Sequence, residues 1–247
     1  PASPPPPPPP NFVVILADDL GLGDVGAFRE LYPGGPADLP PSEEHAGYPG
    51  ARLADPQLAH RYTPNIDQLA KAGVRFTRAY ATAWCAPSRQ MLLSGLWPNR
   101  RSAYDLAQPW FGKQLRAEGY VTGFYGKAHG ARPNGKVVGE AEGEFDDGLF
   151  LETGMTDYYM RPTDVLRGRV KSRAFEQSFD GGEYITDVFT EHAVGFIRRH
   201  APLGAAQPAP FALYLPYTAP HTPLHGKPAD LRALFPTEYA SRTDASI

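Results

Sequence analysis

Three short segments of this chain are rich in apolar and aromatic residues, and each is followed by polar or turn-forming residues. They are residues 12–17, 120–125 and 211–215. Residues 12–17 form a run without any polar side chain, which is typical of a parallel strand that is buried on both faces. We therefore expect three strands, the first of them buried.

Four segments between these strands carry helix signals. Thr63 is a candidate N-cap with Pro64 in the first helical position, and Gly73 ends that pattern. A second helix is expected from Pro87 through Leu93. The other two helices are expected over residues 108–118 and 184–200, the last with apolar residues at the 3.6-residue period. Strands that alternate with helices predict a mostly parallel α/β sheet.

The remaining segments have no clear period. Residues 1–10 contain seven consecutive prolines and are expected to be a disordered tail outside the folded domain, which would cover residues 11–247. Residues 21–61 are expected to form a long irregular loop, and residues 126–182 are rich in loops. Tyr158 and Tyr159, in this second region, fit either a ligand pocket or the core.

Charged and imidazole side chains follow all three expected strands. Asp18 and Asp19 follow the first, Lys127 and His129 the second, and His221 the third. Ligands of open α/β sheets bind at the carboxyl ends of the strands, and parallel strands bring those ends to one edge. Each group taken alone also fits an ordinary solvated turn or loop.

These residue types suit an anion or a hard cation. Two carboxylates at a strand end can reach one Ca²⁺ or Mg²⁺ ion. A lysine supplies a positive charge for an anion, and a histidine exchanges protons near neutral pH. Of the other histidines, His192 falls on the apolar face of its helix and is expected in the core, whereas His225 is expected in a turn.

Cys85 precedes the expected helix that begins at Pro87. The free N–H groups and the dipole at a helix N-terminus favour anions, which makes a thiol placed there reactive. Arg89, four residues along, can reach the same end. The alternative for a lone cysteine is a small buried hydrophobic residue.

Composition excludes several classes of function. The net charge is −3, with 24 Lys and Arg against 27 Asp and Glu, and no basic stripe stands out, so no nucleic-acid partner is expected. The apolar run at residues 12–17 is far shorter than the roughly 18 residues of a membrane span. No signal peptide is visible, and the single cysteine cannot form an intramolecular disulfide.

Several of these segments together resemble the sulfatase family. CAPSRQMLLSG, from Cys85, matches the signature Cys-x-Pro-Ser-Arg followed after four residues by Ser/Thr-Gly. GYVTGFYGKAH, from Gly119 to His129, matches the second signature, with Tyr125 and Ala128 as atypical positions. The segments FVVILADDLGLGD, TPNIDQLAKAGVRFTRAYA and FALYLPYTAPHTPL are also sulfatase-like, and the likeness extends over about residues 11–224.

The resemblance implies an alkaline-phosphatase-like α/β fold, with a mostly parallel sheet sandwiched between helices. It implies that Cys85 is converted to formylglycine by a formylglycine-generating enzyme. Asp18, Asp19 and the modified residue 85 would bind Ca²⁺, with Mg²⁺ as the alternative cation. The activity would be hydrolysis of a small-molecule or saccharide sulfate ester. Family members are often secreted, lysosomal or periplasmic.

The same resemblance gives roles to the other four candidate residues. Arg89 and Lys127 would hold the formylglycine hydrate and the sulfate charge. His129 would take a proton from the hydrate, and His221 would assist the departing alcohol or bind sulfate. A later Asp-Asn metal pair and a later lysine of the family are not found, so the chain is expected to be an N-terminal portion. A phosphate or phosphonate ester hydrolase of the same fold and a non-catalytic fragment remain as alternatives.

Overall fold

The computed structural model describes residues 7–29, 62–97, 110–129, 145–151, 157–159, 182–201 and 209–234. The chain forms two compact units. The first contains Pro1–Asp18 and Thr82–Ile247, and the second contains Asp19–Ala81.

A four-stranded parallel sheet forms the centre of the first unit. Its strands are β1 (Phe12–Leu16), β2 (Val121–Lys127), β3 (Asp147–Leu151) and β4 (Phe211–Pro216), in the order β1-β4-β2-β3. All three neighbouring pairs are parallel. The parallel α/β class expected from the sequence is therefore confirmed.

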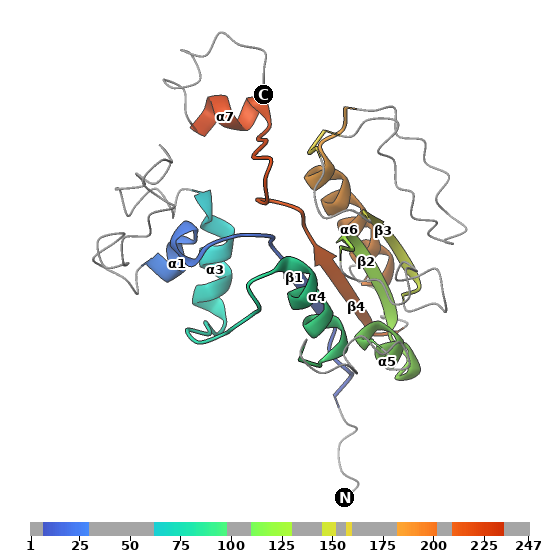
Figure 1. The fold of residues 1–247 in the computed structure, drawn as a ribbon. Helices are drawn as coiled ribbons and strands as arrows, with labels where there is room; N and C mark the ends of the chain where they lie inside the picture. The colour runs from blue at the N-terminus through green and yellow to red at the C-terminus, as the bar shows by residue number, and fades with distance from the viewer. Residues whose placement is uncertain are drawn as a thin grey trace, which may run out of the picture. The chain divides into compact units, whose positions relative to one another are not determined.

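Helices cover both faces of this sheet. α6 (Ile185–His200) packs on one face, where alternate residues of β4, such as Leu213 and Leu215, join its apolar side. On the opposite face, Tyr214 of β4 packs with Phe124 and with Leu93 of α4 (Cys85–Ser94), and Phe111 of α5 (Phe111–Ala117) lies against them (Figure 1). The layered arrangement implied by the resemblance is confirmed in this unit. A further helix, α7 (Pro228–Leu234), follows β4.

Local sequence signals placed most of these elements within a few residues. α6 begins one residue after the expected position, and β2 continues two residues further than expected. α4 begins at Cys85, not at Pro87, so the cysteine itself is the first helical residue. α5 is shorter than expected, although residues 108–109 of the expected helix lie outside the described residues.

Two expectations about the sheet were wrong. β3 was not predicted, because its five residues follow a loop-rich region and include only three apolar side chains. β1 is not buried on both faces: Val13 is 46% exposed and Ile15 is 60% exposed. β1 stands at the end of the strand order, so its α6-side face extends past the helix that covers the other strands.

The second unit contains η1 (Leu22–Asp24), α1 (Gly26–Arg29) and α3 (Pro64–Ala72). The bounds predicted for α3 are confirmed, with Thr63 as N-cap and Gly73 as C-cap. The expectation of an irregular loop over residues 21–61 was wrong for its first part, which is helical. Residues 30–61 lie outside the described residues.

Two polar side chains connect α3 to α1: that of Thr63, the N-cap of α3, and that of Asp67 within α3. Thr63 Oγ1 accepts a hydrogen bond from the Gly26 amide at 2.9 Å, and Asp67 Oδ1 accepts one from the Ala27 amide at 2.7 Å. Thr63 Oγ1 also donates to Asp67 Oδ1 at 3.2 Å. The first amides of α1 have no partners within that helix, so these bonds satisfy them.

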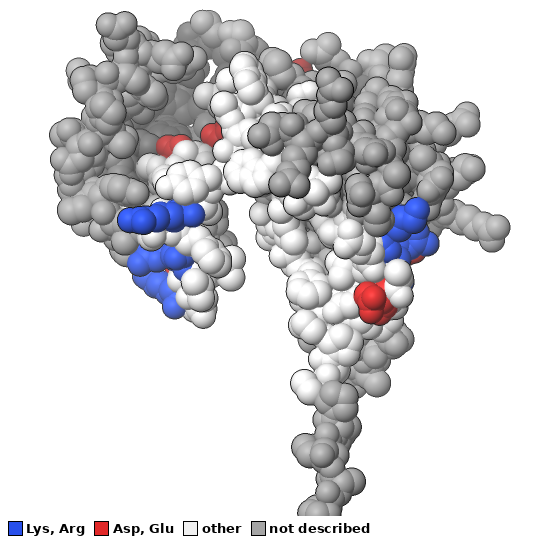
Figure 2. Space-filling model, turned by 60° about the horizontal axis from the view of Figure 1, so that its bottom comes forward, with Lys and Arg blue, Asp and Glu red and all other residues white. Residues whose placement is uncertain are grey.

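The described surface of the face in Figure 2 consists mostly of uncharged residues, with Lys and Arg side chains in separate small groups. Within the described ranges, no helix combines the length and apolarity that crossing a bilayer requires.

We expect Gly126→Ala to destabilise the first unit by roughly 2–6 kcal/mol. Gly126 has φ +143°, and a Cβ there would overlap the backbone carbonyl of Pro216 on β4. Gly195→Ala is the matched control, because Gly195 lies inside α6 with only the end of the Arg199 side chain nearby, at 3.4 Å. That change should alter stability by less than about 1 kcal/mol. Chemical denaturation of both variants measures the difference, and equal midpoints would contradict the prediction.

Candidate active site

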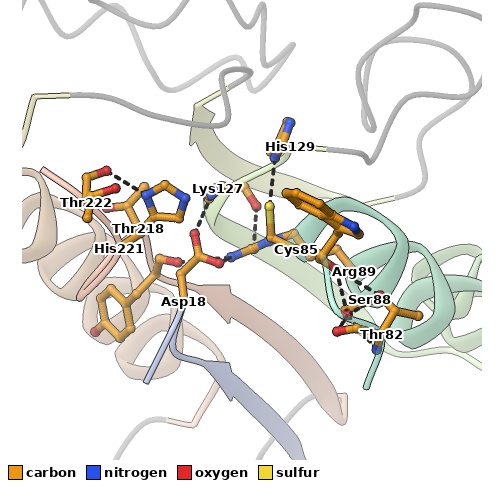
Figure 3. Close-up of polar contacts among 12 residues, drawn as sticks. Asp18, Thr82, Cys85, Ser88, Arg89, Lys127, His129, Thr218, His221 and Thr222 are labelled. Atoms are coloured by element: carbon orange, nitrogen blue, oxygen red, sulfur yellow. Dashed lines mark hydrogen bonds and ion pairs between the residues drawn. The ribbon is translucent and has the colours of Figure 1, made fainter. Parts of the chain in front are cut away.

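The carboxyl ends of three parallel strands and the N-terminus of α4 meet at one place in the first unit. Asp18 follows β1, Lys127 ends β2, and His221 follows β4, while Cys85 begins α4. Figure 3 shows these side chains converging from separate elements. The structure therefore brings together six of the seven candidate residues, and the seventh, Asp19, belongs to the second unit.

The centre of this cluster is a buried carboxylate that pairs with two cations. Arg89 Nη2 lies 3.1 Å from Asp18 Oδ1, and Lys127 Nζ pairs with Asp18 Oδ2. The exposed fractions of Asp18, Arg89 and Lys127 are 4%, 2% and 0%. Lys127 is therefore a buried residue at the end of β2, and the alternative of an exposed loop residue does not hold.

Backbone carbonyl groups hold the Arg89 guanidinium in place. Arg89 Nη1 donates to the Lys127 carbonyl at 3.0 Å, and Nη2 donates to the Tyr217 carbonyl at 3.3 Å. Arg89 therefore joins α4 to the ends of β2 and β4. One carboxylate and two cations leave an excess of one positive charge in a region shielded from water. Such a charge favours an anion nearby.

Cys85 and His129 form a thiol–imidazole pair beside this buried charge. Cys85 Sγ lies 3.3 Å from His129 Nδ1. Partial burial lowers the pKa of His129, and the positive charges of Lys127 and Arg89 lower it further. A lowered pKa keeps the imidazole neutral at neutral pH, so that it can accept a proton from the group at position 85.

Ser88 holds the turn that leads into α4. Its hydroxyl lies 2.8 Å from Thr82 Oγ1 and donates to the Trp84 carbonyl at 2.8 Å, and the Thr82 amide donates to it at 3.1 Å. These bonds fix the backbone immediately before Cys85. The serine of the CAPSR segment therefore orients the cysteine and does not itself face the buried charge.

His221 lies on the loop after β4, and a hydrogen bond shows which of its ring nitrogens carries a proton. Its Nδ1 lies 2.6 Å from the Thr222 carbonyl, which can only accept, so Nδ1 carries the proton. Proton exchange at this residue therefore falls to Nε2. The charge of His221 also contributes to lowering the pKa of His129, as a smaller effect than burial and the two cations.

The described residues do not fit a divalent cation as they are arranged. Both oxygens of Asp18 already pair with cations, and no group of three or more His, Cys, Asp or Glu side chains suited to a metal occurs in the described ranges. Asp19 has φ +63° and is exposed. The cation site expected from Asp18, Asp19 and Cys85 stays a prediction.

One buried residue of this region, Thr218, was not singled out by its sequence pattern, and a second, Tyr158, has two alternatives in the sequence. Thr218 is 4% exposed, and its hydroxyl has no hydrogen-bond partner in the described structure. Its position three residues before His221 and two residues after the end of β4 could have indicated it. Tyr158 is 2% exposed and belongs to the core on the α6 side of the sheet. Of the two alternatives, a ligand pocket or the core, the structure therefore favours the core.

The two further histidines that the sequence analysis considered, His192 and His225, have other contacts. His192 is half-buried on α6 and stacks on the Tyr125 ring with centroids 6.1 Å apart, as expected for a core position. His225 Nδ1 lies 3.2 Å from Asp157 Oδ1. His225 therefore supports the loop after β4.

Comparisons with known proteins connect this chain with one family. A family model described as Sulfatase matches residues 10–246. The chain is 34% identical over 145 residues to arylsulfatase A of Homo sapiens, covering 53% of this chain and 23% of the relative. It is 27% identical over 240 residues to N-acetylgalactosamine-6-sulfatase of Homo sapiens, covering 86% and 40%.

A crystal structure of Ps i-CgsB has a similar fold, with a TM-score of 0.63 and 27% sequence identity. The match covers 93% of this chain and 49% of that one. A second structure of the same protein is a complex with k-i-k-neocarrahexaose. The chain thus spans half or less of the length of these similar proteins.

Proposed function

Because the chain belongs to the sulfatase family, we propose that it hydrolyses sulfate monoesters at the cluster around Cys85. The observation that carries the proposal is the position of Cys85. It begins α4, faces the His129 imidazole at 3.3 Å, and stands in the same cluster as the buried Arg89 and Lys127 cations. A nucleophile, a base and an anion-binding charge are what sulfuryl transfer requires.

Recognition of the sulfate group falls to the buried cations. Asp18 neutralises only one of the two positive charges, so the pair retains attraction for an anion. Fixed charges in a site shielded from water stabilise developing negative charge without reorganising, which is usually the largest contribution to catalysis. Arg89 is held by two backbone carbonyls and keeps its orientation during the reaction.

Residue 85 carries the nucleophile in this proposal. Formylglycine made from Cys85 would supply, as its hydrate, the hydroxyl group that attacks sulfur. His129 Nδ1 is the nitrogen that faces residue 85, so it would take the proton of the hydrate's remaining hydroxyl. Loss of that proton would let the bound sulfate leave by cleavage of its C–O bond, and the aldehyde would form again. The lowered pKa of His129 keeps that nitrogen available at neutral pH.

His221 serves the leaving group. Its Nδ1 donates to the Thr222 carbonyl, so in the doubly protonated ring Nε2 is the nitrogen that gives a proton to the departing alcohol. The Thr218 hydroxyl, buried and without a partner in the described structure, is available for a hydrogen bond to the ester.

A Ca²⁺ or Mg²⁺ ion held by Asp18, Asp19 and residue 85 belongs to the proposal only through the family. No step above depends on it, because both Asp18 oxygens are already paired. Conversion of Cys85 requires a formylglycine-generating enzyme as a partner. Secretion, or a lysosomal or periplasmic location, is likewise proposed from the family alone.

The substrate class that we propose is a sulfated saccharide or a simpler aryl sulfate. The names of the similar proteins support both, since they include an arylsulfatase, an N-acetylgalactosamine-6-sulfatase and a protein solved with an oligosaccharide.

The test compares turnover of an aryl sulfate and the matching aryl phosphate by the purified chain, after expression with a formylglycine-generating enzyme. Intact mass establishes conversion, because residue 85 then loses H₂S and gains one oxygen atom. We expect sulfate to be hydrolysed much faster than phosphate. A preference for phosphate would favour a phosphate ester hydrolase, and converted protein that hydrolyses neither would overturn the proposal.

A further inference from the structure

The loop after β4 is a turn whose two ends contact the same tyrosine hydroxyl. The turn is closed by the His221 amide, which donates to the Thr218 carbonyl at 3.0 Å. The Tyr158 hydroxyl lies 2.9 Å from that same Thr218 carbonyl and 2.8 Å from the His221 carbonyl. Since a carbonyl only accepts, the single phenol proton is shared between the first and last residues of the turn.

Tyr158 is itself held firmly. Its ring is 2% exposed and stacks on Tyr184 with centroids 5.8 Å apart. Its carbonyl accepts a hydrogen bond from the Ile185 amide at 2.8 Å, at the start of α6. The hydroxyl that contacts the turn is therefore attached to the rigid core and does not move with the loop.

The turn carries two groups of the proposed site and contacts a third. It begins at Thr218, whose hydroxyl is buried, and ends at His221. Between them, the Ala219 carbonyl accepts a hydrogen bond from the Asp18 amide at 3.0 Å. Residues 217–227 form no helix or strand, so side chains must hold the turn where regular structure does not.

Two neighbouring tyrosines contact the later part of the same loop. Tyr184 donates to the His225 carbonyl at 2.8 Å, and the Tyr159 hydroxyl lies 3.4 Å from the Gly226 carbonyl. Of these three tyrosines, Tyr158 is the one whose hydroxyl group has described hydrogen bonds to the turn itself. The other two therefore provide natural controls.

We propose that Tyr158 is a positioning residue that places the His221 imidazole for proton transfer to the leaving group. The proposal rests on the function proposed above. Without the phenol hydroxyl, the carbonyls of Thr218 and His221 lose a donor and the turn loses its connection to α6. A displacement of about 1 Å at a catalytic group can lower a rate by as much as a hundredfold.

Tyr158→Phe tests this directly, because it removes one oxygen atom and keeps the ring. We expect kcat for an aryl sulfate with a poor leaving group to fall at least about tenfold, with KM changing less than about threefold. An aryl sulfate with a good leaving group needs little protonation and should be much less affected. Tyr159→Phe should leave both substrates near the wild-type rate.

A double variant separates positioning from a general structural effect. In a His221→Ala background, Tyr158→Phe should lower kcat for the aryl sulfate with the poor leaving group by less than about twofold, because the imidazole that Tyr158 positions is gone. A full tenfold loss in that background would overturn the proposal. So would equal losses for the good and the poor leaving group.

Hydrogen exchange gives a readout that does not depend on sulfatase activity. The His221 amide closes the turn, so Tyr158→Phe should speed its exchange by roughly tenfold, whereas Tyr159→Phe should not. Unchanged exchange at His221 would overturn the proposal even in an active enzyme. If the wild-type protein hydrolyses no sulfate ester, the proposed function fails, and this exchange measurement still decides whether Tyr158 holds the turn.

Discussion

Cys85→Ala is expected to reduce sulfate ester turnover to background while leaving the fold intact. The Cys85 side chain is partly buried, and the contact described for its sulfur is the one with His129, so removing the sulfur creates little cavity. We expect the melting temperature to change by no more than a few degrees, corresponding to less than about 1 kcal/mol. Turnover of an aryl sulfate and thermal melting, measured on the same preparation, check both parts.

Cys85→Ser is the informative companion of this variant. Serine retains an attacking oxygen but cannot become the aldehyde, so we expect at most slow or single-turnover sulfation. A burst of one product molecule per protein, followed by a halt, would support the proposed role of residue 85. Sustained turnover by the serine variant would show that formylglycine is not needed.

Asp18→Asn is expected to cause a large loss of stability. It leaves Arg89 and Lys127, both almost completely buried, without their shared counter-charge. Removing one partner of a buried ion pair costs about 3–5 kcal/mol. For a chain of this size, that corresponds to a drop in melting temperature of roughly 6–20 °C.

Asp187→Asn is the matched control for this effect. Asp187 pairs with Lys227 at 2.9 Å, but the two side chains are 48% and 35% exposed. An exposed pair contributes about 0–1 kcal/mol, so this variant should melt close to the wild type. Equal losses for the two variants would contradict the assignment of a buried charge cluster. Adding Lys127→Met to Asp18→Asn should recover part of the loss, because one unpaired cation is removed.

The charge imbalance at Asp18 connects stability with the proposed function. One carboxylate is needed to keep two buried cations in the folded protein, and a second carboxylate would cancel their attraction for an anion. The site therefore retains positive charge at some cost in stability. An anionic ligand such as inorganic sulfate should offset that cost and raise the melting temperature of the wild-type protein.

Local patterns were sufficient wherever an element is decided by its own residues. The bounds of α3 follow from Thr63, Pro64 and Gly73, and α6 follows from its apolar period. Pro87, as a residue typical of the first helical position, placed Cys85 just before a helix start. These signals are short-range, since capping and periodicity depend on neighbours within one or two turns.

Expectations based on local sequence were wrong where distant elements decide the outcome. The exposure of β1 depends on its place in the strand order, which its own apolar residues do not specify. β3 is stabilised by pairing with β2 and by aromatic contacts such as that between Phe150 and Phe124. Neither effect can be recognised from a short stretch of neighbouring residues.

The chain's own residues thus specify the parallel α/β class, most helix bounds, the family and the set of chemically active side chains, because each depends on short-range patterns or on recognisable motifs. Tertiary structure alone decides that Asp18 pairs with two cations, that Cys85 faces His129, and that Tyr158 holds the turn at His221. These contacts join residues that are between 44 and 109 positions apart in the chain. Residues so far apart in the chain come into contact only when the sheet has formed and the ends of its strands lie side by side.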